Sequence, residues 1–179
     1  AILHNLKNTT VYIMGALLAL IGTGSFLFHT FATKWAQFTD VIPIGLFQLF
    51  FIWSYIQNIM KINIVKSILF TLSFIAISIA TGVLPPLLNG SIGYAPALLY
   101  MIIIGIYHLM ARKESRWLIL SAAIIFTFSL AFRSLDMTLC KQLPKGTHFM
   151  WHILNGVTLY LLVFAYMKNI RKQIEVKNG

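Results

Sequence analysis

Residues 65–84 read VKSILFTLSFIAISIATGVL. Lys66 is the one ionisable side chain in this stretch. An α-helix needs about 20 predominantly apolar residues to cross the hydrocarbon core of a bilayer. A run of this length and composition therefore predicts a membrane-spanning helix.

Runs of the same kind recur along the whole chain. Short breaks separate them and carry charges or the turn residues Pro, Asn and Gly. The six runs lie at Thr10–Phe31, Val41–Ile59, Val65–Leu84, Ile92–Met110, Trp117–Phe132 and Phe149–Met167. No break is long enough to hold a separate domain. We therefore predict an all-α, polytopic transmembrane helix bundle, with residues 1–179 forming a single integral-membrane domain.

The composition supports this fold class and excludes others. Of the 179 residues, 59% are hydrophobic and 10% are charged, whereas soluble domains carry about 25% charged residues. This deficit excludes a water-soluble globule, a disordered tail and a coiled coil. A net charge of +10 would by itself suggest nucleic-acid binding. The cations lie in the short breaks between apolar runs, however, and this placement indicates membrane topology instead.

The cations are divided unevenly between the two sides of the membrane. If the six spans alternate in direction, 10 of the 14 Lys and Arg residues fall on the side that holds both termini. Cytoplasmic loops carry the excess of Lys and Arg in membrane proteins. We therefore expect a multi-pass protein with cytoplasmic termini.

Costly polar side chains gather at the opposite, non-cytoplasmic ends of the spans. A polar or ionisable group in a membrane helix is expensive unless it is paired, so a group of them at one depth indicates a functional site. In chain order these residues are Ser25, His29, Asp40, Asp136, His148 and His152.

The spacing of the histidines favours a metal site. Ser25 and His29 are four residues apart, as are His148 and His152, so each pair lies on one helix face. Two such histidines can bind one Zn²⁺, and catalytic zinc typically takes three protein ligands. Cys140 is the single cysteine, which excludes a cysteine-built zinc site. We predict Zn²⁺ held by His29, His148 and His152.

Several of these residues also have a simpler interpretation. Interhelical hydrogen bonding would account for the pair that begins at His148 if it stood alone. Ser25 could be a small packing residue that bonds to the carbonyl of the preceding turn. Asp136 could pair with Arg133 one turn away or orient a ligand histidine, and both interpretations stay open. Trp151 fits either an interfacial aromatic belt or a pocket wall.

Four short features of the sequence carry a resemblance to a known family. They are GSFLFH at residues 24–29, Asp40 with Pro43, Asp136 to Cys140, and GTHFMWH at residues 146–152. Together they resemble the alkaline ceramidase family. That family lies within a wider superfamily of seven-helix membrane hydrolases, which also includes adiponectin-receptor-like and Per1-like proteins. The 11-residue step from His29 to Asp40, the Asp-x3-Cys motif and the Trp before the last His point to the ceramidases.

The resemblance implies a zinc-dependent intramembrane amidase, a hydrolase that cleaves ceramide-like lipids to a sphingoid base and a fatty acid. Zinc-bound water would attack the amide carbonyl. Asp40 is expected to act as general base and then general acid, and Ser25 to donate a hydrogen bond to the oxyanion or the water. Asp136 and Trp151 would lie beside the three histidine ligands. The lipid substrate would enter from the bilayer, and the sequence indicates no protein partner.

The sequence departs from the family pattern in two respects. The family has seven helices and an acidic N-terminal segment that binds calcium, whereas the sequence has six spans and no acidic residue before Asp40. The chain is thus a shorter relative or lacks the first helix, and calcium dependence stays open.

The main alternative is a zinc-containing receptor-like or lipid-remodelling protein that acts on another lipid. A proton-coupled transporter is disfavoured, because the middles of the third and fourth spans contain no acid or histidine.

Overall fold

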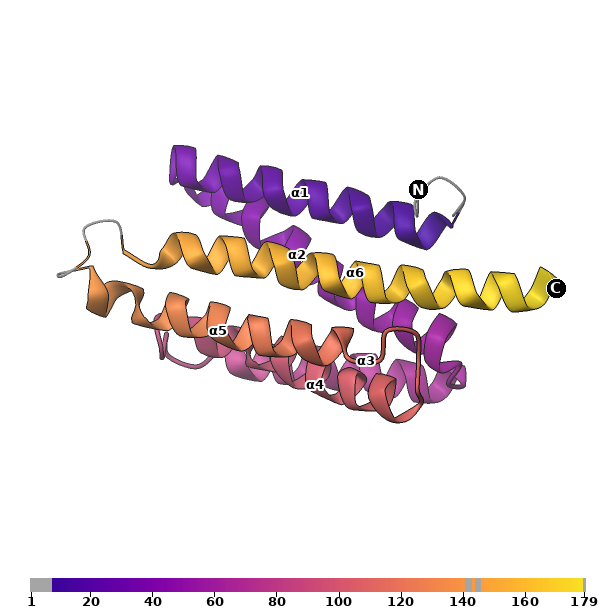
Figure 1. Ribbon diagram of the computed structural model, residues 1–179. Coiled ribbons are helices and arrows are strands. Elements are labelled where there is room, and N and C mark those ends of the chain that lie inside the picture. Colours follow the sequence, from indigo (N-terminus) through magenta and orange to yellow (C-terminus); the bar gives the residue numbers. More distant parts are fainter. Residues whose placement is uncertain (1–7, 141–142, 144–145, 179) are drawn as a thin grey trace. The chain divides into compact units, whose positions relative to one another are not determined.

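The computed structural model describes residues 8–140, 143 and 146–178, which form helices and connecting turns with no strand among them (Figure 1). A π-helical turn, η1, follows α2, and a 3₁₀ turn, η2, precedes α4. In chain order the elements are α1 (Thr9–Phe31), α2 (Lys34–Tyr55), η1 (Ile56–Met60), α3 (Ile64–Gly82), η2 (Ser91–Tyr94), α4 (Ala95–Met110), α5 (Leu118–Leu139) and α6 (His148–Asn178).

Six helices of the described residues are long and apolar enough to cross a membrane, which confirms the predicted all-α class and the six spans. Three of them extend well beyond the predicted spans, and one of these is α6, which continues to Asn178 rather than ending at Met167. Helix α2 begins at Lys34 rather than Val41, and α5 continues to Leu139 rather than ending at Phe132. A hydropathy pattern marks the apolar residues alone, whereas backbone hydrogen bonding carries a helix on through its polar turns. Asp40 and Asp136 therefore lie inside helices.

The chain divides into two compact units, which are described in turn. The first unit is Ala1–Ser67 with Gln173–Gly179, and the second is Ile68–Lys172. Helices α1 and α2 belong to the first unit, and α4, α5 and most of α6 belong to the second. That they act as one integral-membrane domain stays a prediction.

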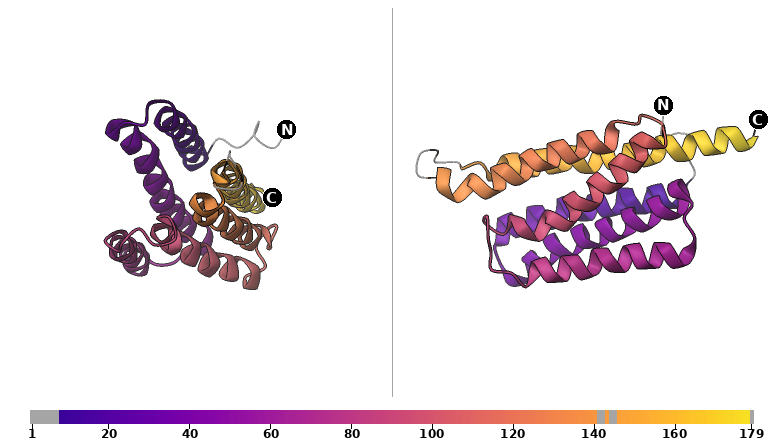
Figure 2. Two further views of the ribbon diagram at one scale, coloured as in Figure 1. Left: turned by 90° about the vertical axis from the view of Figure 1, so that its left-hand side faces the viewer. Right: turned by 90° about the horizontal axis from the view of Figure 1, so that it is seen from below.

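In the first unit, α1 and α2 form a helical hairpin and lie side by side (Figures 1 and 2). Asn8 caps the start of α1, because its side-chain oxygen accepts the amide of Val11 at 3.2 Å. Ala32 ends the helix in the left-handed conformation, with φ at 49°. Across the turn, the rings of Phe31 and Trp35 lie 5.5 Å apart. The hairpin therefore reverses within a few residues.

The two helices of the hairpin approach most closely at Gly24. A Cβ atom built on Gly24 would overlap the carbonyl of Thr39. That carbonyl cannot accept the usual hydrogen bond from four residues ahead, because Pro43 has no N–H. The freed oxygen lies against the α-carbon of Gly24, in a position suited to a weak Cα–H···O contact. A side chain at residue 24 would therefore push α1 and α2 apart.

In the second unit, α4 and α5 pack side by side, and the segment before α4 is tied to α5. Asn89 donates its side-chain amide to the carbonyl of Arg133 at 2.9 Å. The hydroxyls of Ser134 and Ser91 share a hydrogen bond, also at 2.9 Å. These two bonds fix the end of the α3–α4 connection against the last turns of α5.

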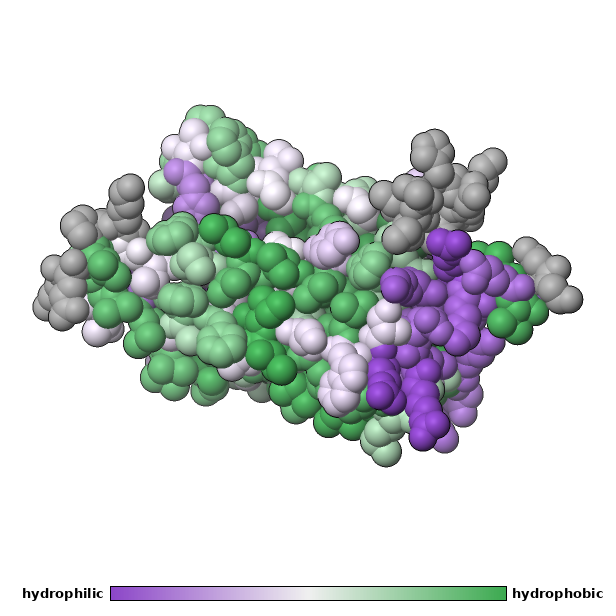
Figure 3. Space-filling model, viewed as in Figure 1, coloured by the Kyte–Doolittle hydropathy of each residue, from purple (hydrophilic) through white to green (hydrophobic). Residues whose placement is uncertain are grey.

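The other end of the second unit is held by Glu114, in the connection between α4 and α5. The backbone amide of Glu114 donates to the side-chain oxygen of Asn169 on α6 at 3.0 Å. Nε2 of His108 lies 3.1 Å from the backbone oxygen of Glu114. Lys172 pairs with the Glu114 carboxylate and holds the pKa of that carboxyl below its usual value. Hydrophilic residues gather toward this C-terminal part of α6, while apolar side chains cover its middle (Figure 3). This distribution suits a helix whose end leaves the membrane.

We predict that Gly24→Ala destabilises the protein by about 1–3 kcal/mol, because the added methyl must displace the Thr39 carbonyl. Gly22→Ala is the matched control in the same helix, since a Cβ there meets no atom within 4 Å. Alanine should stabilise that position slightly through its higher helix propensity. Thermal unfolding in detergent measures both. Equal unfolding temperatures for the two variants would contradict the close approach.

Candidate functional site

Three of the predicted site residues lie in the first unit, where α1 ends and α2 begins. Ser25 and His29 are one helical turn apart on α1, and Asp40 lies in the second turn of α2. Ser25 and Asp40 directly follow Gly24 and Thr39, the two residues whose backbones touch. Ser25 and Asp40 are half-buried, whereas His29 is exposed. The helix contact thus brings the backbones that carry Ser25 and Asp40 together.

The other predicted residues lie in the second unit, and Asp136 organises them. One oxygen of its carboxylate accepts the backbone amides of Thr147 at 2.6 Å and His148 at 3.0 Å. The other oxygen lies 3.8 Å from Nδ1 of the His148 ring. The first amides of a helix have no partner within it, and a negative charge is favourable there. Asp136 therefore secures the start of α6 and borders the ring of its first histidine.

The connection before α6 fits tightly around this carboxylate. Gly146 has φ at 59°, a left-handed conformation that glycine adopts without strain. A Cβ atom there would overlap the carboxylate of Asp136 and crowd the sulfur of Cys140. The Cys140 sulfur itself lies 3.9 Å from the carboxylate. Glycine is thus required at this position for two independent reasons.

His148 and His152 face each other along the first turns of α6. Their ring centroids are 4.8 Å apart, and one ring nitrogen of each lies within 4.8 Å of the other. Both side chains are half-buried. The i, i+4 spacing therefore gives the predicted pair of neighbouring imidazoles, which can offer two nitrogen ligands to one metal ion.

Trp151 packs into the second unit. It is 3% exposed, and its ring lies 4.9 Å from that of Tyr94 and 5.9 Å from that of Phe126. Its backbone carbonyl accepts a hydrogen bond from Ser129 on α5 at 2.9 Å. Trp151 is therefore buried in the second unit, which does not fit an interfacial belt, and its role as a pocket wall stays a prediction.

Arg133 and Asp136 do not form the ion pair that the sequence allowed. The Arg133 side chain packs against aromatic rings instead. Its guanidinium carbon lies 5.3 Å from the ring centroid of Tyr94 and 5.1 Å from that of Trp151. The predicted span ended at Phe132, so the sequence interpretation placed this arginine in a polar connection. Had the predicted span included Arg133, an ionisable residue within a membrane helix would have marked it as a candidate functional residue.

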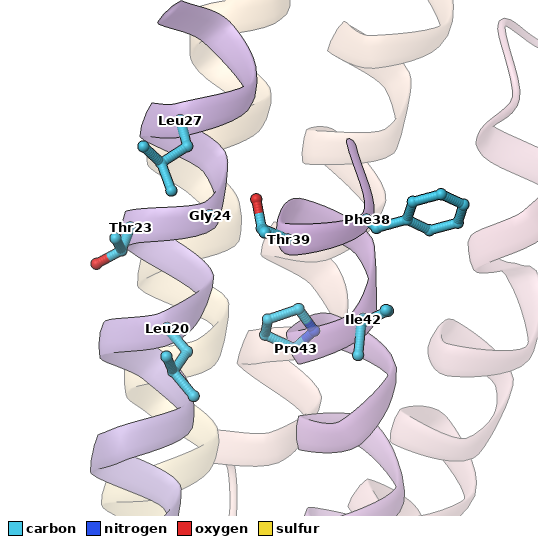
Figure 4. A pocket seen from close by; sticks show the side chains of 8 residues that line it. All are labelled: Leu20, Thr23, Gly24, Leu27, Phe38, Thr39, Ile42 and Pro43. Atoms are coloured by element: carbon cyan, nitrogen blue, oxygen red, sulfur yellow. The ribbon is translucent and has the colours of Figure 1, made fainter. Parts of the chain in front are cut away.

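An apolar groove runs along the α1–α2 hairpin, and its lining includes Gly24 and Thr39, which precede Ser25 and Asp40 in the sequence. It has a volume of about 340 Å³. In Figure 4, Thr39 and Pro43 face α1, whereas the ring of Phe38 points away from it. The lining residues are Leu20, Thr23, Gly24, Leu27, Phe38, Thr39, Ile42 and Pro43.

A family model described as Ceramidase matches residues 1–178 of the chain. The chain belongs to the Ceramidase family. The match includes both units, and membership supports ceramide hydrolysis as the general activity. No curated protein and no solved structure gives a significant match. For this ceramidase-family chain, the sequence resemblance is therefore confirmed at the level of the family.

We predict that Asp136→Ala lowers the stability of this ceramidase-family protein by about 1–2 kcal/mol, as the loss of a helix cap does. Asp136→Asn keeps one oxygen for the amides of Thr147 and His148 and should cost less. Thermal unfolding compares the variants, and hydrogen exchange reports on the two amides directly. Unchanged protection of those amides in Asp136→Ala would show that the carboxylate does not hold the start of α6.

Proposed function

We propose that the protein is a zinc-dependent intramembrane amidase that cleaves the amide bond of ceramide-type lipids to a sphingoid base and a fatty acid. The observation that carries this proposal is the Ceramidase family match over residues 1–178. The imidazole pair on α6, with a carboxylate beside its first ring, adds chemical support.

The donor set of the second unit fits zinc. Neutral imidazoles are common zinc ligands, and a ligand histidine usually turns its second ring nitrogen toward a carboxylate. Asp136 lies on the Nδ1 side of His148, so Nε2 is the proposed metal ligand of that ring. His152 would supply the second nitrogen. A bound zinc ion would polarise the amide carbonyl and lower the pKa of its bound water to about 7.

His29 on α1 is the proposed third ligand. If the six spans alternate in direction, the end of α1 and the start of α6 fall on the same side of the membrane. That side would be the non-cytoplasmic one, because 10 of the 14 Lys and Arg residues belong to the other side. The termini are accordingly proposed to be cytoplasmic.

Asp40 and Ser25 would carry the proton transfers and hydrogen bonding of the reaction. Asp40 would take a proton from the attacking water and return it to the leaving nitrogen, a role for a carboxylate held close to the reacting atoms. Ser25 would donate its hydroxyl to the oxyanion as the amide carbonyl is attacked. Loss of such a donor costs roughly 10²–10³ in rate in well-studied hydrolases.

The apolar groove of the hairpin is the proposed slot for one alkyl chain of the substrate. Its walls are formed largely by Leu, Ile, Phe and Pro side chains, and two of its lining residues, Gly24 and Thr39, directly precede Ser25 and Asp40. A chain lying there would bring the lipid amide toward these two side chains. The lipid would enter from the bilayer, without passing through water.

A matched lipid panel tests the proposed reaction. Purified protein is given a ceramide and an ester lipid of the same acyl length, and mass spectrometry follows the release of the sphingoid base and the fatty acid. The amide lipid alone should be cleaved. Hydrolysis of the ester without release of a sphingoid base would overturn the proposal and favour a lipid-remodelling function.

Metal content and turnover together test the assigned roles. We expect about one zinc per chain in the wild-type protein, loss of both zinc and turnover in His148→Ala, and retention of zinc in Asp40→Ala. Turnover in Asp40→Ala should fall by roughly 10²–10⁴, the usual contribution of a general base. Elemental mass spectrometry measures the metal. Normal turnover in Asp40→Ala would remove that residue from the mechanism, and zinc retained in His148→Ala would remove the metal site.

A further inference from the structure

Arg133 carries a charge inside the membrane-spanning helix α5, and the mechanism above does not use it. Its Nε atom is buried and has no hydrogen-bond partner among the described residues. An ionisable group within a span is costly unless something pairs with it. The described part of the chain therefore leaves this one donor of the guanidinium without a partner.

The guanidinium is held in a defined position. It lies over the rings of Tyr94 and Trp151, at 5.3 and 5.1 Å from their centroids. A Cβ atom on Gly90 would lie 3.6 Å from its Nη2 atom, so the α3–α4 connection approaches the guanidinium closely there. Asn89 fixes that connection by its hydrogen bond to the Arg133 carbonyl. The side chain is thus packed against two aromatic rings and the α3–α4 connection.

The aromatic rings stabilise the charge but do not satisfy its donors. A guanidinium has five N–H donors, whereas an aromatic face offers an electrostatic attraction and no lone pair. The acidic residues of the second unit are already engaged, since Glu114 pairs with Lys172 and Asp136 accepts the first amides of α6. Neither carboxylate of the described second unit therefore pairs with the guanidinium, and the unpartnered Nε points to a group from outside this unit.

We propose that Arg133 binds an anionic oxygen group of the lipid that the protein processes. Arg133 lies one turn before Asp136 on α5, and Trp151 lies one turn after His148 on α6, so the guanidinium is close to the start of the histidine helix. Arginine is the preferred residue for carboxylates and phosphates, because its N–H groups can bind two oxygens at once. The oxyanion has two sources, a phosphate on the substrate head group or the carboxylate of the released fatty acid. The proposal rests on the proposed function for the identity of the lipid, and its binding test does not require turnover.

Binding to the full chain carrying Asp40→Ala tests the proposal without hydrolysis. The first arm compares a ceramide with its 1-phosphate, and the second compares a fatty acid with the alcohol of the same length. In at least one arm the anionic lipid should bind about tenfold more tightly, as expected for a charge-assisted contact. Arg133→Gln should abolish that difference, and Arg133→Lys should keep part of it. Arg116→Gln is the matched control, because its guanidinium lies 5.9 Å from the ring centroid of Trp117 at the other end of α5.

The outcomes separate this proposal from the proposed function. A preference for the 1-phosphate assigns the site to the substrate head group, and a preference for the fatty acid assigns it to the product. Equal binding in both arms, or a preference that survives in Arg133→Gln, overturns the proposal. Absence of ceramide hydrolysis in the wild type, with Arg133-dependent anion binding retained, would reject the proposed function alone. If Arg133→Gln fails to fold, Arg133→Lys decides, since loss of the paired donors should still weaken the anion preference.

Discussion

The carboxylate of Asp136 is the contact on which the second unit depends. It accepts the first amides of α6 and lies beside His148, so one group both starts the helix and orders its first histidine. Because the i, i+4 spacing then places His152, the position of the whole imidazole pair follows from this capping interaction. Gly146 makes it possible by leaving room for the carboxylate.

The first unit is organised by an approach of two backbones. Pro43 frees the carbonyl of Thr39, and Gly24 allows α1 to pack against that oxygen. The residues that follow each contact point are Ser25 and Asp40, the two candidates for proton transfer and hydrogen bonding. Positioning from the backbone suits this role, since it does not depend on how the neighbouring side chains repack.

The sequence predicted the elements of this fold better than their ends and contacts. Long apolar runs predict membrane helices directly. The i, i+4 spacing of His148 and His152 predicts neighbouring imidazoles from the helix alone, without any tertiary contact. The extension of α5 to Leu139 could not be read from hydropathy, because polar residues occupy its last turns. Arg133 was consequently placed outside the span, and its packing against Trp151 depends on contacts between helices that no local pattern encodes. For the same reason the sequence left two roles open for Asp136, an ion pair with Arg133 and the orientation of a ligand histidine. Its contacts with the first amides of α6 could not be predicted without the positions of those amides.

The dual engagement of Asp136 bears on how the chain enters the membrane. Its side chain is only 13% exposed, and it finds its amide partners in residues that are synthesised after α5 is complete. Until α6 is in place, the carboxylate lacks these amide partners, and an unsatisfied carboxylate is costly wherever it lies within the bilayer. Helices α5 and α6 therefore gain by entering together as one hairpin, with the carboxylate satisfied as soon as Thr147 and His148 emerge.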